Sequence, residues 1–534
     1  MSLKSKNVIF EVTMSKKSFI GGTIILVIAG LIVRILGFFY RIYLSNLIGA
    51  EGMGLFGLIS PVYSLVILTL TSGISIAVSQ MVAAENARGH DVNLKRITRC
   101  ALLIVCTAGI IVSVIMYLFA GFIVDTVLKD SRTYYSLILL IPCIPVIAAA
   151  SAIKGYFYGL QDVTPTAVSQ IVEQLVRIGL VLAAASYFVD LGIEFACAVA
   201  VAGMSIGEIA NLAVVYIVYT RKNKQVIKSR NGLMRKRTII TNIMKISLPV
   251  SFNRFITSIM SATESILIPR RLLAGGLDYS SSIAEFGRLT GMTMPLLFFP
   301  SIVTSSLSTT LVSALSEAMS VKNYRSVNYR ISKSIQLSFI MGFIFAAIFF
   351  AYPHEIGNLF YKRENIGELL KVMSFTCVFM YLQQTLLGVL NGLGKQGISL
   401  RNSVIGYLIR IGFVYYAIPL WGINGYVWGI LISSVFVCIL NLSSVMRTTG
   451  MNLDLGNWIV KPGIVGMVMA ISGKYILCFF SIFSIGKSLT IIMAVTGNVA
   501  IAFFLMILAG VMDKDEFLRL AGIKKGNAMK LYKK

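Results

Sequence analysis

The apolar residues of this chain are gathered in long runs that are separated by short polar connections. A helix that crosses a bilayer needs about 20 mostly apolar residues. Fourteen such runs lie near 18–46, 53–84, 98–121, 134–160, 165–188, 195–219, 239–268, 286–315, 334–353, 369–390, 397–420, 423–446, 459–483 and 488–511. The pattern therefore predicts an all-α polytopic membrane protein with about 14 transmembrane helices, and it excludes an outer-membrane barrel, whose strands alternate in short segments.

The basic residues follow the connections between these runs. Of the 48 Lys and Arg residues, 32 fall in segments that lie inside the cell if the N-terminus is inside, and 9 fall in outer segments. Cytoplasmic loops of membrane proteins collect positive charge, so both termini are predicted to be cytoplasmic. The first apolar stretch is long and lacks an A-x-A cleavage site, so we expect it to stay in the membrane as an anchor.

Composition strengthens this interpretation. The 534 residues are 57% hydrophobic and 13% charged, with a mean hydropathy of +0.82, and this charge cannot cover the surfaces of several soluble domains. A net charge of +26 in a soluble chain would suggest nucleic acid. Here the excess of Lys and Arg in the predicted cytoplasmic segments accounts for the positive net charge, so no nucleic-acid partner is expected. The basic segments are expected to contact membrane lipids.

An internal repeat with an offset of about 233 residues is visible in the sequence. Gly155, Gly159, Arg177 and Gly179 recur as Gly388, Gly392, Arg410 and Gly412. The offset covers six helices, which predicts two six-helix lobes related by an axis along the membrane normal, as in parallel-repeat transporters. The expected domains are an N-lobe (1–219), a basic cytoplasmic inter-lobe loop (220–238), a C-lobe (239–447), two further helices (448–511) and a basic cytoplasmic tail (512–534).

The sequence lacks the motifs that are typical of nucleotide-hydrolysing, metal-binding and triad-containing enzymes. The chain contains no Walker A motif, its seven cysteines have no C-x-x-C spacing, and its two histidines are not placed for a triad. No channel-type filter such as TVGYG occurs either. The sequence therefore predicts a transporter that is not an enzyme, that uses no cofactor and that has no metal site.

Ionisable residues inside the predicted spans suggest what is transported. Such residues are costly in a bilayer unless they face water or a partner. Seven are basic and three acidic: Arg34, Arg41, Arg177, Lys245, Arg254, Arg410 and Lys474 against Glu173, Glu208 and Glu264. The surplus of positive charge favours a cavity that receives an anionic substrate.

Four arginines are the candidate substrate-binding residues. Arg34 and Arg41 share a helix face about 10 Å apart along the axis, and no acidic residue lies between 18 and 50. Arg254 begins a polar stripe on the seventh span, and Arg288 opens the eighth. Guanidinium groups suit bidentate contacts with phosphate, so these arginines are predicted to hold a phosphate or pyrophosphate group in the cavity.

Further residues are candidates for the cavity wall. Thr257, Ser261 and Glu264 continue the stripe of the seventh span and could take part in ion coupling, although Ser and Thr also serve as packing residues between helices. Arg177 can be satisfied by Glu173 one turn away. As repeat mates, Arg177 and Arg410 either hold the lobes together or line the cavity, and the sequence leaves both open.

Several stretches resemble a known family. F-I-G-G-T-I-I-L-V-I-A-G-L-I-V-R-I-L-G-F-F-Y-R (19–41), L-I-G-A-E-G-M-G-L (47–55), G-R-L-T-G-M-T-M-P-L-L-F-F-P (287–300) and S-x-L-S-E-A (313–318) are similar to the stage V sporulation protein B family. This family belongs to the multidrug/oligosaccharidyl-lipid/polysaccharide flippase superfamily and is related to lipid II flippases. The resemblance extends over essentially the whole chain.

The resemblance implies a bacterial cytoplasmic-membrane exporter of lipid-linked sugar precursors, with spore cortex peptidoglycan as the destination and cell-wall synthesis enzymes as candidate partners. Lipid II flippases share R-x-L-G-F, whose arginine matches Arg34, and their eighth-helix arginine matches Arg288. Their second first-helix arginine falls at Tyr40, one position before Arg41, and a nearby acidic position falls at Gly291. Their last two helices help to form a groove for the lipid tail, which suits 459–511.

The leading hypothesis is a flippase that moves an undecaprenyl-pyrophosphate-linked saccharide across the cytoplasmic membrane by alternating access. The alternative is a cation-coupled multidrug antiporter of the same fold, which needs acidic cavity residues that the first helix lacks. A membrane scaffold that recruits wall enzymes through 220–238 and 514–534 is a third hypothesis. The sequence does not choose the glycan, the energy source or the oligomeric state.

Overall fold

The computed structural model describes residues 3–224, 233–482 and 486–510, and within them every regular element is helical. Among these residues, eight helices are long and apolar enough to cross a membrane, or up to eleven if each bent pair counts as one span. The all-α membrane class is therefore confirmed. That set counts α1 (Leu3–Ala87), which contains two of the predicted runs, as one helix, and it does not include α8 (Lys236–Ala274) or α16 (Gln396–Tyr416). The number fourteen and the orientation of the termini stay predictions.

The chain divides into two compact units. The first comprises residues 1–299 and 407–426, and the second comprises 300–406 and 427–534. The boundaries of these units differ from those of the expected N-lobe and C-lobe, because α8 and the first part of the eighth predicted run pack with the N-terminal helices. The lobe boundaries stay a prediction, and the tail (512–534) and part of the inter-lobe loop (225–232) lie outside the described residues.

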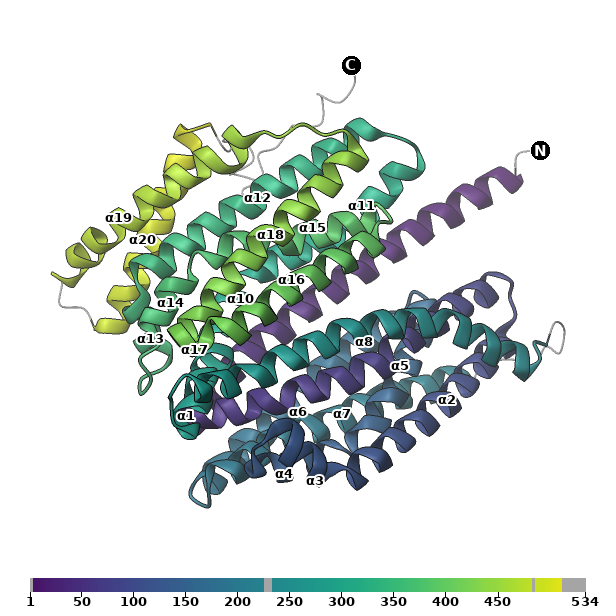
Figure 1. Cartoon of the computed structure of the whole chain (residues 1–534). Coiled ribbons are helices and arrows are strands. Elements are labelled where there is room, and N and C mark those ends of the chain that lie inside the picture. Colours follow the sequence, from purple (N-terminus) through teal and green to yellow (C-terminus); the bar gives the residue numbers. More distant parts are fainter. Residues whose placement is uncertain (1–2, 225–232, 483–485, 511–534) are drawn as a thin grey trace. The chain divides into compact units, whose positions relative to one another are not determined.

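The first unit is built around the long helix α1. Its elements are α1 (Leu3–Ala87), α2 (Asp91–Leu118), α3 (Ala120–Phe122), η1 (Ile123–Leu128), η2 (Ser131–Thr133), α4 (Tyr134–Leu140), α5 (Cys143–Gly159), α6 (Thr164–Val189), α7 (Ile193–Lys224), α8 (Lys236–Ala274), α9 (Tyr279–Gly287), η3 (Arg288–Thr293), α10 (Met294–Phe298), the end of α16 (Gln396–Tyr416), α17 (Ile418–Trp421) and the start of α18 (Ile423–Thr449). Helix α5 packs against α1, α2 and α7, and α6 pairs with α7 (Figure 1).

Helix α1 contains two of the predicted runs. Its apolar part, Val27–Ala87, has 61 residues, about three times the length that one crossing needs. At Gly49 the backbone leaves helical geometry, with φ 69° and ψ −174°. Residues with a side chain rarely adopt a positive φ, so glycine permits the break where the first two predicted runs meet.

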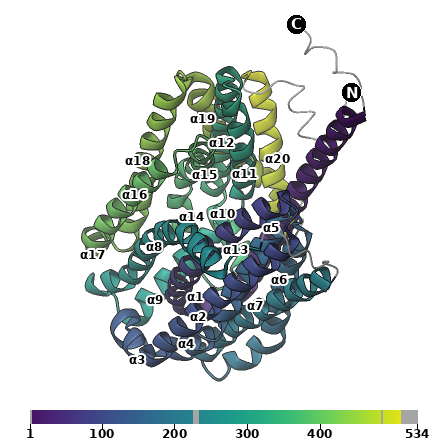
Figure 2. The ribbon, with the colours of Figure 1, turned by 90° about the vertical axis from the view of Figure 1, so that its right-hand side faces the viewer.

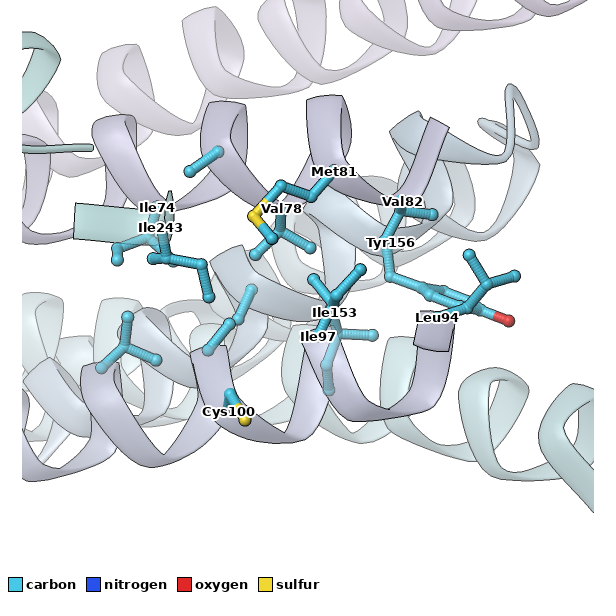
Figure 3. Close-up of a cluster of buried hydrophobic side chains, with 14 of the residues drawn as sticks. Ile74, Val78, Met81, Val82, Leu94, Ile97, Cys100, Ile153, Tyr156 and Ile243 are labelled. Carbon is cyan, nitrogen blue, oxygen red and sulfur yellow. The ribbon is translucent and has the colours of Figure 1, made fainter. Parts of the chain in front are cut away.

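A buried apolar cluster joins five helices of the first unit, α1, α2, α5, α7 and α8. Ile74, Val78 and Val82 of α1 meet Ile97 of α2, and Tyr156 of α5 closes the cluster (Figure 3). Ile243 of α8 lies in the same cluster. Helix α8 is therefore anchored to the N-terminal helices by apolar packing, which explains why it belongs to the first unit.

The second unit is assembled around α12. Its elements are α11 (Ser301–Ser320), α12 (Tyr324–Ala351), α13 (Pro353–Phe360), α14 (Gly367–Met373), α15 (Thr376–Gly392), most of α16 and α18, η4 (Gly456–Val460), α19 (Lys461–Ser481) and α20 (Lys487–Leu508). Helix α15 packs against α11 and α12, and α19 packs against α12 and pairs with α20 (Figure 2). A buried hydrogen bond from Asn498 Nδ2 to Tyr352 Oη (3.2 Å) fixes α20 beside the end of α12.

The two glycine pairs of the predicted repeat have equivalent surroundings within their own units. A Cβ atom added at Gly155 would lie 2.7 Å from the carbonyl oxygen of Ser75. A Cβ atom added at Gly388 would meet the backbone of Ser308, which is the residue 233 positions after Ser75. Both glycines thus allow a close helix approach, at positions that the predicted offset relates to one another.

Candidate functional site

The four candidate arginines all belong to the first unit. Arg34 and Arg41 lie on the first half of α1, Arg254 lies on α8, and Arg288 begins η3. Arg34 and Arg254 are exposed, whereas Arg41 and Arg288 are half-buried. Two of the four guanidinium groups thus reach the surface of helices that are otherwise apolar.

The packing of α1 against the α9–η3–α10 segment fixes the register of these arginines. The ring centroids of Phe38 and Phe299 are 4.3 Å apart, and the Ser45 hydroxyl group donates to the Gly291 carbonyl oxygen at 3.3 Å. Gly287 lies directly against the backbone of Ala50. The two segments therefore run antiparallel, since rising numbers on one meet falling numbers on the other.

This register separates two of the candidates in depth. Arg288 lies next to the part of α1 around Ala50, while Arg34 lies one turn before Phe38. At 1.5 Å per residue the distance along α1 is on the order of 20 Å. Arg41 falls between these two levels. The arginines thus occupy successive levels along α1 and do not meet in one turn.

Arg288 and Arg254 differ in their partners. The Arg288 Nη1 atom donates to Glu285 Oε1 at 2.7 Å, one turn earlier on α9. For the Arg254 guanidinium group, no hydrogen bond or ion pair occurs within the residues that the structure describes. One acidic neighbour therefore tempers the charge of Arg288, and the charge of Arg254 has no such compensation.

The far end of the polar stripe on α8 is occupied by protein partners. Glu264 is only 5% exposed, and its Oε1 atom accepts hydrogen bonds from Arg410 Nε (2.7 Å) and Tyr426 Oη (2.8 Å). The Arg410 guanidinium group also lies over the Tyr407 ring, 4.4 Å from its centroid. Arg410 is thereby engaged inside the unit, and Glu264 has its counter-charge.

Two hydroxyl groups of the predicted stripe, those of Thr257 and Ser261, lie between Arg254 and Glu264 on α8. The Thr257 hydroxyl group donates to the Arg254 carbonyl oxygen of the same helix at 3.0 Å. Ser261 is half-buried. The stripe is therefore divided: its Arg254 end is exposed, and its Glu264 end is bound to α16 and α18.

A second buried polar cluster lies between α6 and α7. Arg177 Nη2 donates to Glu173 Oε1 at 2.7 Å, and Asn211 Nδ2 donates to Glu173 Oε2 at 2.6 Å and to Glu208 Oε2 at 3.2 Å. The Tyr63 hydroxyl group of α1 donates to Glu208 Oε1 at 3.2 Å. The sequence indicated the Glu173–Arg177 pair from its spacing but not the link to Glu208.

The sequence did contain a signal for the link of Glu208 to the Glu173–Arg177 pair. Glu208 and Asn211 are three residues apart on α7 and so share a face, and a connection of three residues joins α6 to α7. A short connection makes two helices antiparallel neighbours, which brings the middle of α7 to the middle of α6.

Long apolar helices with ion pairs buried inside them define the class of multi-pass membrane transporters. Residues 19–319 match a family model described as polysaccharide biosynthesis protein, and residues 289–416 match the MatE model. The chain belongs to the polysaccharide biosynthesis protein family. It is 32% identical over 518 residues to stage V sporulation protein B of Bacillus subtilis (strain 168), an alignment that covers 95% of this chain and 98% of that protein.

Two more distant likenesses agree with this assignment. Lipid II flippase MurJ of Bacillus subtilis (strain 168) is 23% identical over 420 residues, which is 73% of this chain and 75% of that protein. A multidrug resistance MATE family transporter of the MOP superfamily, solved in an inward-facing conformation, has a TM-score of 0.62 at 15% identity and covers 79% of this chain and 100% of its own. The protein is a multi-pass transporter of the bacterial cytoplasmic membrane.

Proposed function

We propose that this transporter is a flippase that moves an undecaprenyl-pyrophosphate-linked saccharide from the inner to the outer leaflet. The saccharide is a peptidoglycan precursor for the spore cortex, and cell-wall synthesis enzymes are its proposed partners outside the transport step. The names of two relatives, stage V sporulation protein B and lipid II flippase MurJ, support this choice. The main structural support for the proposal is that two arginines, Arg34 and Arg254, are exposed on apolar helices of the first unit.

The arginines supply the pyrophosphate contacts. Arg34, Arg41 and Arg288 occupy successive levels along α1, so a pyrophosphate can pass from one guanidinium group to the next during export. Arg254 adds a fourth charge from α8. Guanidinium groups bind phosphate oxygens in pairs, which favours a phosphorylated lipid over a neutral one. In this proposal Thr257 and Ser261 contact the sugar, and α19 and α20 hold the polyprenyl chain.

Translocation in proteoliposomes tests the proposal. A fluorescent undecaprenyl-pyrophosphate saccharide is the substrate, and its exposure in the opposite leaflet is measured over time. We expect the wild type to translocate it and Arg34→Ala and Arg254→Ala each to lose about tenfold or more, because a charged hydrogen bond contributes roughly 1.5–3 kcal/mol. The matched control is Arg237→Ala, an exposed arginine near the start of α8.

The second candidate function is a cation-coupled multidrug antiporter. The match of residues 289–416 to the MatE model and the likeness to a multidrug transporter favour it. Its expected coupling residue would be Glu264, yet Arg410 and Tyr426 occupy that carboxylate. Exchange of a cationic drug for protons or sodium that depends on Glu264, with no transport of the lipid-linked saccharide, would establish the antiporter instead.

A further inference from the structure

The polar cluster between α6 and α7 holds more acid than its arginine can neutralise. Two carboxylates, Glu173 and Glu208, share the amide group of Asn211 at 2.6 Å and 3.2 Å. Arg177 forms an ion pair with Glu173 at 2.7 Å. The contacts of Glu208 in the described part of the chain are with the neutral groups of Asn211 and Tyr63. Glu208 is therefore the acid without a counter-ion in direct contact.

The position of Glu208 makes this imbalance costly. The residue is 8% exposed and Asn211 is fully buried. Glu208 lies 15 residues from the start of the 32-residue helix α7, about 22 Å from that end, and so near the middle of the span. A buried carboxylate that has hydrogen bonds but no counter-ion in direct contact is costly to keep charged, and binding a proton removes that cost.

The surroundings of Glu208 do not supply a second ion pair. The titratable or charged groups that act on it come from α1, α5 and α6, and they are Tyr63, Cys143, Lys154, Glu173 and Arg177. Lys154 acts through space, but no ion pair joins Lys154 to Glu208 within the described ranges. Glu173 opposes a second negative charge, since both carboxylates lie on the same amide. One proton on the pair relieves this repulsion.

Asn211 is suited to both protonation states. Its Nδ2 atom donates to the carboxylate, as observed at 3.2 Å. Its Oδ1 atom is buried and has no hydrogen-bond partner in the described structure. A protonated Glu208 carries an O–H donor that needs an acceptor, and the unfilled Oδ1 atom belongs to the amide group that already contacts Glu208. The Nε atom of Arg177 is likewise buried without a hydrogen-bond partner among the described residues, so the cluster has spare hydrogen-bonding capacity.

The repeat-related cluster lacks this feature. Arg410 is the repeat mate of Arg177 and pairs with one acid, Glu264, at 2.7 Å. In this helix the register of the repeat shifts, since Asn211-Leu212 recurs as Asn441-Leu442 at an offset of 230 and not 233. At this local offset, the position of Glu208 corresponds to Cys438. The surplus acid therefore occurs in one cluster and has no counterpart at the equivalent position of the other.

We propose that Glu208 binds one proton from the outer side and releases it to the cytoplasmic side in each transport cycle, which couples export to the proton gradient. The proposal rests on the proposed function for what is exported. The proton itself is accounted for at one site: the Glu208 carboxylate becomes a carboxylic acid and is regenerated when the proton leaves. Asn211 and Tyr63 are positioning residues.

The first test measures transport under imposed pH gradients. Proteoliposomes with the fluorescent lipid-linked saccharide are held at zero membrane potential, and the pH of the compartment that corresponds to the cell exterior is lowered. We expect the wild-type rate to rise with the inward proton gradient and the Glu208→Gln rate to be independent of it. Glu194→Gln, the same change on the same helix, should retain the wild-type response. A wild-type rate that ignores the gradient overturns the proposal.

The second test detects the proton directly and does not require a substrate. Infrared difference spectra of the purified protein after a pH jump report the carbonyl stretch of a protonated carboxylic acid. We expect this band in the wild type and its loss in Glu208→Gln. The band should change position in Tyr63→Phe, because one hydrogen bond to the carboxyl group is removed. The Tyr63→Phe variant keeps the test valid if Glu208→Gln does not fold.

The two tests separate the possible failures. If the wild type moves no lipid-linked saccharide at any gradient, the proposed function fails while the infrared band still decides the proton site. A band that is absent from the wild type, or that is unchanged in both Glu208→Gln and Tyr63→Phe, rejects Glu208 as the proton carrier whatever the substrate is.

Discussion

Each arginine of the predicted repeat pair finds a glutamate within the first unit, but by different routes. Arg177 takes Glu173 from its own helix at a spacing of four residues. Arg410 takes Glu264 from a helix that lies 146 residues earlier in the chain. Both guanidinium groups are thus engaged by acidic partners, and their assignment to the lobe interface or to the cavity stays a prediction.

The Glu264–Arg410 pair yields the first prediction. Arg410→Met removes the counter-ion and leaves a carboxylate that is 7% exposed. Breaking one partner of a buried ion pair costs roughly 3–5 kcal/mol, so the melting temperature of the detergent-purified protein should fall clearly. Thermal unfolding followed by circular dichroism measures it.

The double variant makes this prediction specific. In Glu264→Gln/Arg410→Met the uncompensated charge is gone, and the Tyr426 hydroxyl group can still donate to the new amide oxygen. We expect most of the lost stability to return. Arg401→Met, an exposed arginine on α16, is the control and should change little. If the double variant is as unstable as Arg410→Met, packing of the arginine and not its charge stabilises the site.

Close helix packing at glycine is the main feature at the scale of elements, and it gives the second prediction. Gly155→Ala would place a Cβ atom 2.7 Å from the Ser75 carbonyl oxygen and 3.0 Å from the Val78 side chain. Helices α1 and α5 would have to separate, so we expect a lower melting temperature and a lower yield of folded protein.

A glycine in open space is the matched control. Gly179, on α6, has no atom within 4 Å of an added Cβ, and alanine favours a helix by up to about 1 kcal/mol relative to glycine. Gly179→Ala should therefore be neutral or slightly stabilising. Equal losses of stability in Gly155→Ala and Gly179→Ala would contradict the packing argument.

The elements and the site were predictable from the sequence to different degrees. Apolar runs predicted where the helices lie, since a membrane span leaves a strong local signal. The spacing of Glu173 and Arg177 predicted a contact within one helix. The contacts of Glu264 with Arg410, and of Tyr63 with Glu208, depend on which helices pack together and in which register. No local pattern carries that information, so these partners and the depths of Arg34 and Arg288 required the structure.

At the scale of the molecule, the polar connections at one end of the first unit are tied together by a charged network. Arg132 Nη1 donates to Glu51 Oε1 at 2.7 Å, and Arg132 Nη2 donates to Asp130 Oδ2 at 2.9 Å. The Ser280 hydroxyl group donates to the same Glu51 oxygen at 2.7 Å. The network joins the α1 bend to η2 and α9, at the end of the helices that is predicted to face outside.

Asp278 helps to fix the start of α9 in this region. As the N-cap residue, its carboxylate accepts a hydrogen bond from the Ser281 backbone N–H group at 3.0 Å. Hydrogen bonds from the Ser281 side chain and backbone lower the pKa of Asp278 below its usual value, so the cap remains charged at neutral pH. The helix therefore presents Ser280 to Glu51 in a defined position.

If the transporter works by the proposed alternating access, its outer end opens in every cycle, and we predict that this network opens with it, which is the third prediction. Arg132→Ala removes the guanidinium group that links Glu51 to Asp130, so the contact between α9 and α1 should open more often. Ser282→Cys serves as the reporter, because Ser282 of α9 is fully buried in this structure. Labelling by a membrane-impermeant maleimide should be several times faster in Arg132→Ala/Ser282→Cys than in Ser282→Cys alone.

The control is Lys362→Ala, because Lys362 is an exposed residue on the predicted outer side. This change should leave the labelling rate of Ser282→Cys unchanged. Equal rates with and without Arg132 would mean that apolar packing alone, including the close approach of Gly287 to Ala50, keeps this end closed.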